Sequence, residues 1–348
     1  MIMNYSISVL FRAIPLFMAL FCFAYGAFIF LTGNDPDSKT AGPVLFFLGS
    51  ICVALFCTAA TIIRQIIHTY NEKIKIVLPV IGYSTALITL ICGVIMIAAG
   101  PDYFVAGHVV SGLGLITACV STAATVSAKF ALIPENNTSG TTEVNTKAYG
   151  ETAELFFKVL TGLFALAAWI WAFILLSGAA STPHFVAGTV MAGIACICTS
   201  LIALVASIIR QERNVYHAKD KQQWPRLVLI MGTIALLWGI ILLIFYYGNV
   251  RDFVGYVMIG LGLVCYSISS KVILLAKVWR ADYPLAARIP LIPVLTALCA
   301  LFIAAFLFQG ALLEAKYFVP ARVLAGLGAI CFTLFSIVSI LESGTSKK

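Results

Sequence analysis

The chain has 348 residues, of which 61% are hydrophobic and only 10% are charged. Soluble globular proteins carry about a quarter charged residues, so this composition excludes that class and indicates a membrane protein. The formal net charge of +8 therefore bears on membrane sidedness, and nucleic acid is not expected as a partner.

Ten apolar runs follow one another along the chain. Each has about 20 residues, enough to cross a hydrocarbon layer of about 30 Å as a helix, and helices satisfy their own backbone groups in lipid. The first run is too long for the apolar region of a signal peptide and lacks a small-residue cleavage site, so we expect it to be a span. The predicted spans are 10–31, 43–63, 76–99, 106–127, 155–177, 187–208, 226–247, 255–276, 288–309 and 319–341.

Ten cysteines all lie within these apolar runs, and no C-x-x-C spacing occurs. A disulfide framework or a zinc site is therefore not expected. The sequence predicts no bound metal and no cofactor, and the cysteines are interpreted as small apolar side chains.

The even-numbered spans repeat one phrase. Valine recurs in all five, followed mostly by glycine three and five residues later. The intervals of 65, 81, 67 and 66 residues, the long one containing a hydrophilic insert, indicate an internal repeat. The predicted fold is an all-α polytopic membrane protein with ten transmembrane helices, built as five parallel-repeat helical hairpins in one transmembrane domain. The aligned valines are Val44, Val109, Val190, Val257 and Val323. The predicted hairpins cover 10–70, 73–130, 154–212, 224–280 and 286–342, with a hydrophilic cytoplasmic insert at 131–153.

Positive charge is distributed unevenly between the two sets of loops. Four of the 22 lysines and arginines, namely Lys39, Arg251, Lys316 and Arg322, fall on one side, and the other 18 fall on the side of both termini. The positive-inside rule then predicts cytoplasmic termini. Five hairpins running in one direction would be related by an axis along the membrane normal.

Small residues seven apart share one face of each even span. Such a stripe lets two membrane helices approach closely. We therefore expect these residues to lie at helix–helix contacts. They are Gly42, Gly49, Gly107, Gly114, Gly188, Gly255, Gly262 and Gly328.

One column of the repeat varies, at the outer mouth of each even span. It holds Pro43, His108, Thr189, Tyr256 and Arg322. If the hairpins close around an axis, these side chains could form a ring that favours anions or, with His184 nearby, senses mild acid. The alternative is that they are interfacial residues at the starts of helices.

The apolar centres of the spans contain no aspartate or glutamate, which weighs against a proton-coupled transporter. Lys271 lies near the cytoplasmic end of its span and is expected to snorkel. No metalloprotease, P-loop or nucleophile-elbow motif occurs, so the sequence does not indicate an enzyme.

The last repeat, "YFVPARVLAGLGAICFTLFSIVSILESGTSKK", resembles the carboxyl end of the YhiM family of enterobacterial inner-membrane proteins. The phrases "YFVAGHV", "TACVSTAA", "CYSISSKVILLAKVWR" and "RIPLIPV" resemble the same family. The resemblance implies a multi-pass protein of the bacterial inner membrane and a link to acid stress. It implies no catalytic or binding residue.

Two functions remain open. One is a channel or transporter-like pore for small solutes or ions, used in acid or envelope stress. The other is a non-conducting membrane module that binds lipid or a partner protein. A continuous polar passage through the interior would favour the pore, and a closely packed interior would favour the module.

Overall fold

The computed structural model describes residues 5–66, 72–129, 151–212, 217–246, 248–249, 251–277 and 288–345. Within these ranges it contains ten helices long and apolar enough to cross a membrane, and no strand. The helices are α1 (Tyr5–Thr32), α2 (Pro36–Ile66), α3 (Glu72–Ala99), α4 (Phe104–Lys129), α5 (Glu151–Ser177), α6 (Thr182–Glu212), α7 (Asp220–Phe245), α8 (Phe253–Lys277), α9 (Leu291–Gly310) and α10 (Phe318–Thr345), with short 3-10 turns at Pro101–Tyr103 and Ala315–Tyr317. The ten predicted spans are thus confirmed as ten helices. Most of the predicted insert 131–153 lies outside the described residues, and α5 already includes its last three.

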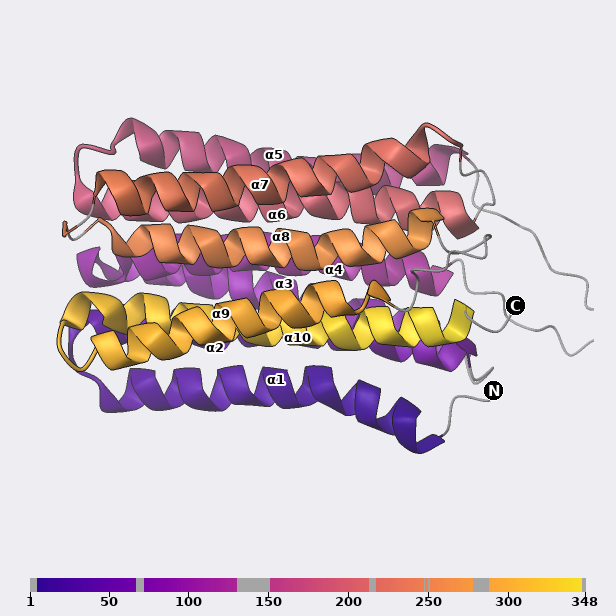
Figure 1. Ribbon diagram of the computed structural model, residues 1–348, viewed down its shortest axis with the longest axis horizontal. Coiled ribbons are helices and arrows are strands. Elements are labelled where there is room, and N and C mark those ends of the chain that lie inside the picture. The colour runs from indigo at the N-terminus through magenta and orange to yellow at the C-terminus, as the bar shows by residue number, and fades with distance from the viewer. Residues whose placement is uncertain are drawn as a thin grey trace, which may run out of the picture.

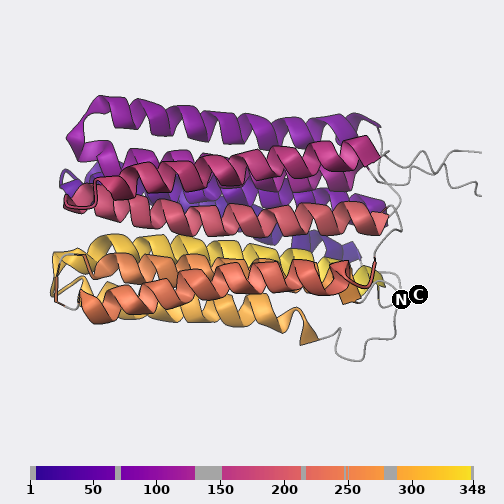
Figure 2. The same cartoon turned by 90° about the horizontal axis from the view of Figure 1, so that it is seen from above.

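The helices run side by side along one direction (Figures 1 and 2). Both described ends of the chain lie at the same end of the bundle, called here the terminal end (Figure 1). The opposite end, the turn end, carries the short connections that follow α1, α3, α5, α7 and α9.

The even-numbered helices form an inner ring. α2 packs on α4, α4 on α6, α6 on α8, α8 on α10, and α10 back on α2. Each odd-numbered helix lies outside this ring, against the even helix that follows it in the chain and against that helix's neighbour. Between 78% and 100% of each even span is buried, compared with 22% to 33% of each odd span. The odd helices therefore form the lipid-facing wall.

Glycines bring each inner helix close to its outer partner. A Cβ built on Gly114 of α4 would lie 2.9 Å from the backbone nitrogen of Leu90 in α3. One built on Gly262 of α8 would lie 3.0 Å from the carbonyl oxygen of Gly232 in α7. The structure places all eight glycines of the predicted stripe in this way, against the outer helix of their own hairpin. Close backbone contact of this kind strengthens the dispersion attraction between the two helices. In lipid this attraction matters because the hydrophobic effect does not drive helices together.

A second glycine column lies where neighbouring inner helices meet. A Cβ on Gly112 would collide with Met191 and Ile194 of the next inner helix, and one on Gly326 would collide with Leu45 and Leu48 across the closure from α10 to α2. Gly193 and Gly260 meet leucines of their next inner helix in the same way. Leucine and methionine side chains thus fill the space above these glycines and hold the inner ring together.

Candidate functional site along the central axis

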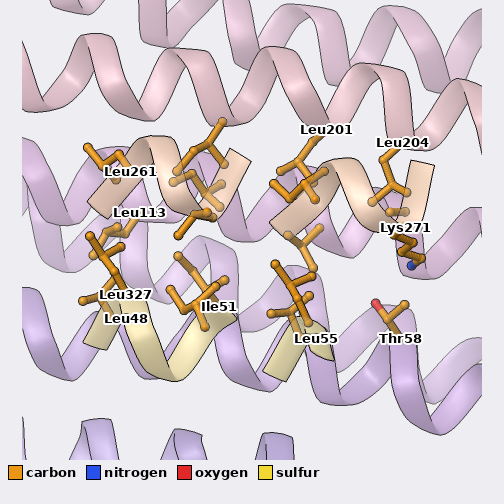
Figure 3. Close-up of a pocket in the computed structure, with 18 residues that line it drawn as sticks. Leu48, Ile51, Leu55, Thr58, Leu113, Leu201, Leu204, Leu261, Lys271 and Leu327 are labelled. Atoms are coloured by element: carbon orange, nitrogen blue, oxygen red, sulfur yellow. The ribbon is translucent and has the colours of Figure 1, made fainter. Parts of the chain in front are cut away.

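A narrow apolar cavity runs along the axis of the inner ring, and all five inner helices line it. The lining residues recur at alternating steps of three and four, the spacing of a coiled-coil seam, and they form four layers (Figure 3). The layer nearest the turn end holds Leu48, Leu113, Leu261 and Leu327; the next holds Ile51, Ile116, Ile197, Val264 and Ile330; the third holds Leu55, Val120, Leu201, Ile268 and Leu334; the fourth holds Thr58, Ala123, Leu204 and Lys271.

The first three layers leave almost no space on the axis. The cavity has a volume of about 30 Å³, room for roughly two water molecules at about 15 Å³ each, and apolar cavities of this kind stay dry. The interior that the structure describes is therefore a packed apolar barrier, without a continuous polar passage.

Lys271 is the exception in this lining. It lies in α8 in the fourth layer, is only 2% exposed, and lies at the same level as Thr58 and Leu204 (Figure 3). The expectation that it snorkels to the interface is wrong, because its side chain turns inward to the axial cavity. Within the described part of the chain its ammonium makes no ion pair with a carboxylate.

The sequence contained a signal for this position. Lys271 stands fourteen residues after Val257, two heptads along the same face, and so falls on the seam that supplies the other layers. Its place near the cytoplasmic end of the span led to the expectation of an interfacial side chain. Whether the side chain is buried depends on the rotation of α8 about its own axis, which is set by packing against four neighbouring helices.

The variable column of the repeat does not line the axial cavity. Its side chains lie at the turn end, between an inner helix and the elements packed outside it. Tyr256 contacts Tyr317 with 6.3 Å between ring centroids. The guanidinium of Arg322 stacks on Phe318 at 3.3 Å and on Phe308 of α9 at 5.1 Å. These side chains fill junctions between hairpins, and Arg322 is thereby held apart from the histidines.

The structure does bring the two predicted histidines together. The rings of His108 in α4 and His184 in α6 lie on one phenyl ring, that of Phe104, at centroid distances of 4.5 and 4.6 Å. Nδ1 of His108 accepts a hydrogen bond from the indole N–H of Trp171 in α5, and Nδ1 of His184 lies 2.6 Å from the hydroxyl of Ser181.

The remaining members of the column have smaller side chains. Thr189 is buried, and its hydroxyl has no hydrogen-bond partner within the described residues. Pro43 borders a second cavity between α1, α2 and α3 at the turn end.

The axial arrangement has a definite physical character. Rings of branched apolar side chains exclude water and block ions by dewetting. An ammonium at one end of such a barrier repels cations and attracts anions. The site therefore combines an apolar barrier along the axis with one positive charge at the end nearer the chain termini.

Comparison with known proteins gives the family. Residues 3–346 match the family described as "Protein of unknown function (DUF2776)". The chain is 45% identical to the "Inner membrane protein YhiM" of Escherichia coli (strain K12), over 99% of this chain and 100% of the relative. No solved structure matches the chain. The resemblance to the YhiM family is thus confirmed, and with ten apolar helices of spanning length it supports a multi-pass protein of the inner membrane. The chain belongs to the DUF2776 family.

Proposed function

We propose that the protein is an inner-membrane channel whose axial pore is closed in this conformation and passes small anions when it opens. The proposal rests on the burial of Lys271 against the axial cavity. Burying an ammonium among apolar side chains in a membrane is costly, so an ionisable residue in such a place usually has a function. On the axis, Lys271 would set the sign of the permeating ion.

The arrangement of helices supports this proposal. Five copies of one hairpin, related by an axis along the membrane normal, would place five equivalent seams around that axis. With both termini in the cytoplasm, the Lys271 layer lies near the cytoplasmic mouth. The apolar layers then stand between Lys271 and the outside.

The resemblance to the YhiM family suggests when such a channel would open. Acid or other envelope stress is the condition we propose, with no enzymatic activity required. The histidine pair on Phe104 lies at the outer face in this orientation, where external acid would reach it first.

The test is ion flux in proteoliposomes. Leu55→Ser together with Leu334→Ser makes the third layer polar, and we expect this variant to conduct chloride where the parent does not. Leu298→Ser, on the lipid-facing side of α9 with 57% of the residue exposed, is the matched control and should stay closed.

Selectivity tests the role of Lys271. Adding Lys271→Glu to the conducting variant should reverse its preference, so that potassium passes better than chloride. If the ratio of chloride flux to potassium flux is the same with and without Lys271→Glu, the assignment of Lys271 is overturned.

The second candidate is a non-conducting membrane module that binds lipid or a partner protein. The close packing of the axis, where the cavity has a volume of only about 30 Å³, favours it. A third-layer variant that stays folded and passes no ion at neutral or acidic pH would decide for the module.

A further inference from the structure

Two junctions between inner helices at the turn end are filled in the same way. A residue of the variable column lies by a residue at the start of the next inner helix: His108 lies by His184, and Tyr256 lies by Tyr317. At the α2–α4 junction the corresponding residues are Pro43 and Tyr103, and Phe47 replaces the glycine found in the other four copies. Pro43 has a smaller side chain than His108 or Tyr256 and fills less space than they do at their junctions.

A large cavity borders Pro43 and Tyr103. Its volume is about 530 Å³, within the range of about 300–1,000 Å³ of ligand pockets in proteins. It lies between α1, α2 and α3, and we call it the α1–α3 groove. Residues from all three helices line it, including Gly26, Phe30, Phe46, Cys92, Ile95 and Tyr103.

The α1–α3 groove faces the bilayer. Its lining runs along α3 from Cys92 to Ala99, seven steps or about 10 Å of helix. Phe30 and Ile95 on its two rims are 42% and 60% exposed. Because the walls are apolar and open toward lipid, a hydrocarbon chain fits them and water does not.

A charged pair stands at the mouth of the groove. The ammonium of Lys39 lies 3.0 Å from Oδ2 of Asp102 and 5.8 Å from the ring centroid of Tyr103, which lines the groove. The two charged side chains are 29% and 61% exposed and lie at the turn end, in the first residues of α2 and in the 3-10 turn before α4. The mouth thus offers one cation and one anion side by side.

We propose that the α1–α3 groove binds phosphatidylethanolamine, with an acyl chain in the groove and the headgroup on Lys39 and Asp102. The phosphate would accept from the Lys39 ammonium, and the primary ammonium of the lipid would donate to the Asp102 carboxylate. The site is separate from the axial cavity and holds whether or not the axis conducts.

The charge at the mouth selects this headgroup. Recognition of anionic lipid usually takes a cluster of lysines and arginines, whereas Lys39 is a single cation already paired with Asp102. A lipid that is itself zwitterionic can replace each partner of that pair. A choline headgroup matches the charges but has no N–H with which to donate to Asp102.

The experiment is native mass spectrometry of the purified full chain, titrated with phosphatidylethanolamine, phosphatidylcholine or phosphatidylglycerol. Ala99→Trp fills the groove, and Ala98→Trp is its matched control, because Ala98 is an exposed neighbour that does not line it. We expect Ala99→Trp to weaken binding about tenfold or more, as expected from losing about two buried methylene groups. Ala98→Trp should bind like the parent.

Headgroup variants complete the test. Asp102→Asn should remove the preference for the ethanolamine over the choline lipid while leaving chain binding in place. Each protein's thermal unfolding is measured first, and Ala27→Trp, also in the groove, replaces Ala99→Trp if that variant does not fold. Equal binding of the three lipids by the parent, stronger binding of the glycerol lipid, or undiminished binding by a folded groove-filling variant would overturn the proposal.

Discussion

The indole N–H of Trp171 in α5 donates a 3.0 Å hydrogen bond to Nδ1 of His108 in α4. This bond requires that Nδ1 carry no hydrogen, so the imidazole is neutral with its proton on Nε2. Protonation would place one N–H against another and remove the bond.

We therefore expect acid to loosen the contact between α4 and α5. Lowering the pH from 7 to 5, the range in which imidazole takes up a proton, should cost about 1 kcal/mol, the size of one buried hydrogen bond. Thermal unfolding in detergent at both pH values measures it. His108→Gln keeps an acceptor for Trp171 but does not titrate, and it should show a smaller drop. An equal drop in parent and variant would show that other groups cause it.

The same pair gives a test in cells. If the histidines sense acid, a double His108→Gln and His184→Gln variant that expresses normally should survive acid worse than the parent. Equal survival would leave the two histidines as packing residues at the α4–α6 junction.

The close approach of helices at glycines can be tested by substitution. Gly114→Leu and Gly262→Leu place a side chain where the partner helix's backbone lies about 3 Å away, and backbone cannot move aside as a side chain can. We expect each to cost about 1–3 kcal/mol or more. Gly162→Leu in α5 is the control, because a Cβ added at Gly162 would meet no other atom within 4 Å. Near-parental thermal stability of Gly114→Leu would contradict the close approach of α3 and α4.

The sequence predicted the ten spans and identified the small-residue columns, because both depend on local composition. Run length determines whether a helix can cross the bilayer, and glycine at a seven-residue spacing indicates a close approach of helices whichever helix is the partner.

The face of each inner helix that lines the axis could not be predicted in this way. In a bilayer the lipid-facing and inward-facing side chains are both apolar, so the inside-to-outside contrast that marks a soluble helix is missing. Ile51 on the axis and Ile95 toward lipid are the same residue type. For the same reason hydropathy alone does not place Lys271 on the axis, although its heptad spacing from Val257 falls on the seam. The partners of His108 depend on how α4 packs against α5 and α6, which no local pattern encodes.

Asp35 gives a pH-dependent prediction outside the membrane spans. It precedes Pro36 at the start of α2; its Oδ1 accepts from the backbone N–H of Ser38 at 2.7 Å and its Oδ2 from the Ser38 hydroxyl at 2.8 Å. These bonds favour the carboxylate and hold the pKa of Asp35 below its ordinary value. The stabilisation is therefore complete above the unfolded-state pKa and is lost as the pH falls through the lower folded-state pKa.

Asp35 thus caps the start of α2. Replacing it should lower the free energy of unfolding near neutral pH and not in strong acid. Asp35→Ala should cost about 1 kcal/mol at pH 7, and the difference from the parent should shrink below the ordinary carboxyl range. Asp37→Ala, two residues on, is the control. Equal effects of the two changes at every pH would contradict the capping role.

Topology is tested by reporter fusions. With both termini cytoplasmic, a reporter after Lys348 and one inserted between Gly33 and Lys39 should report opposite sides of the membrane. Reports from the same side would contradict the arrangement of ten spans as five hairpins. They would also contradict the placement of the Lys271 layer near the cytoplasm.

Closure of the inner ring can be tested by a single cross-link. The hydroxyl of Thr333 in α10 lies 3.8 Å from Sγ of Cys52 in α2, although 281 residues separate them in the chain. Thr333→Cys should therefore form a disulfide with Cys52 under a membrane-permeable oxidant, since facing side chains at this distance can reach disulfide geometry. Cys22 of α1 also lies beside Cys52, so the experiment uses a Cys22→Ala background. Mass spectrometry of fragments should find the segments around positions 52 and 333 joined.

The matched control for this cross-link is Thr125→Cys in α4, a threonine that is also buried but not in contact with Cys52 among the described interactions. A disulfide from position 333 and none from position 125 is expected, because only a closed ring brings the first and last inner helices together. If position 333 stays unlinked while the protein remains folded, α2 and α10 are not neighbours. The inner helices then do not form a closed ring, and the layers and Lys271 do not share one axis.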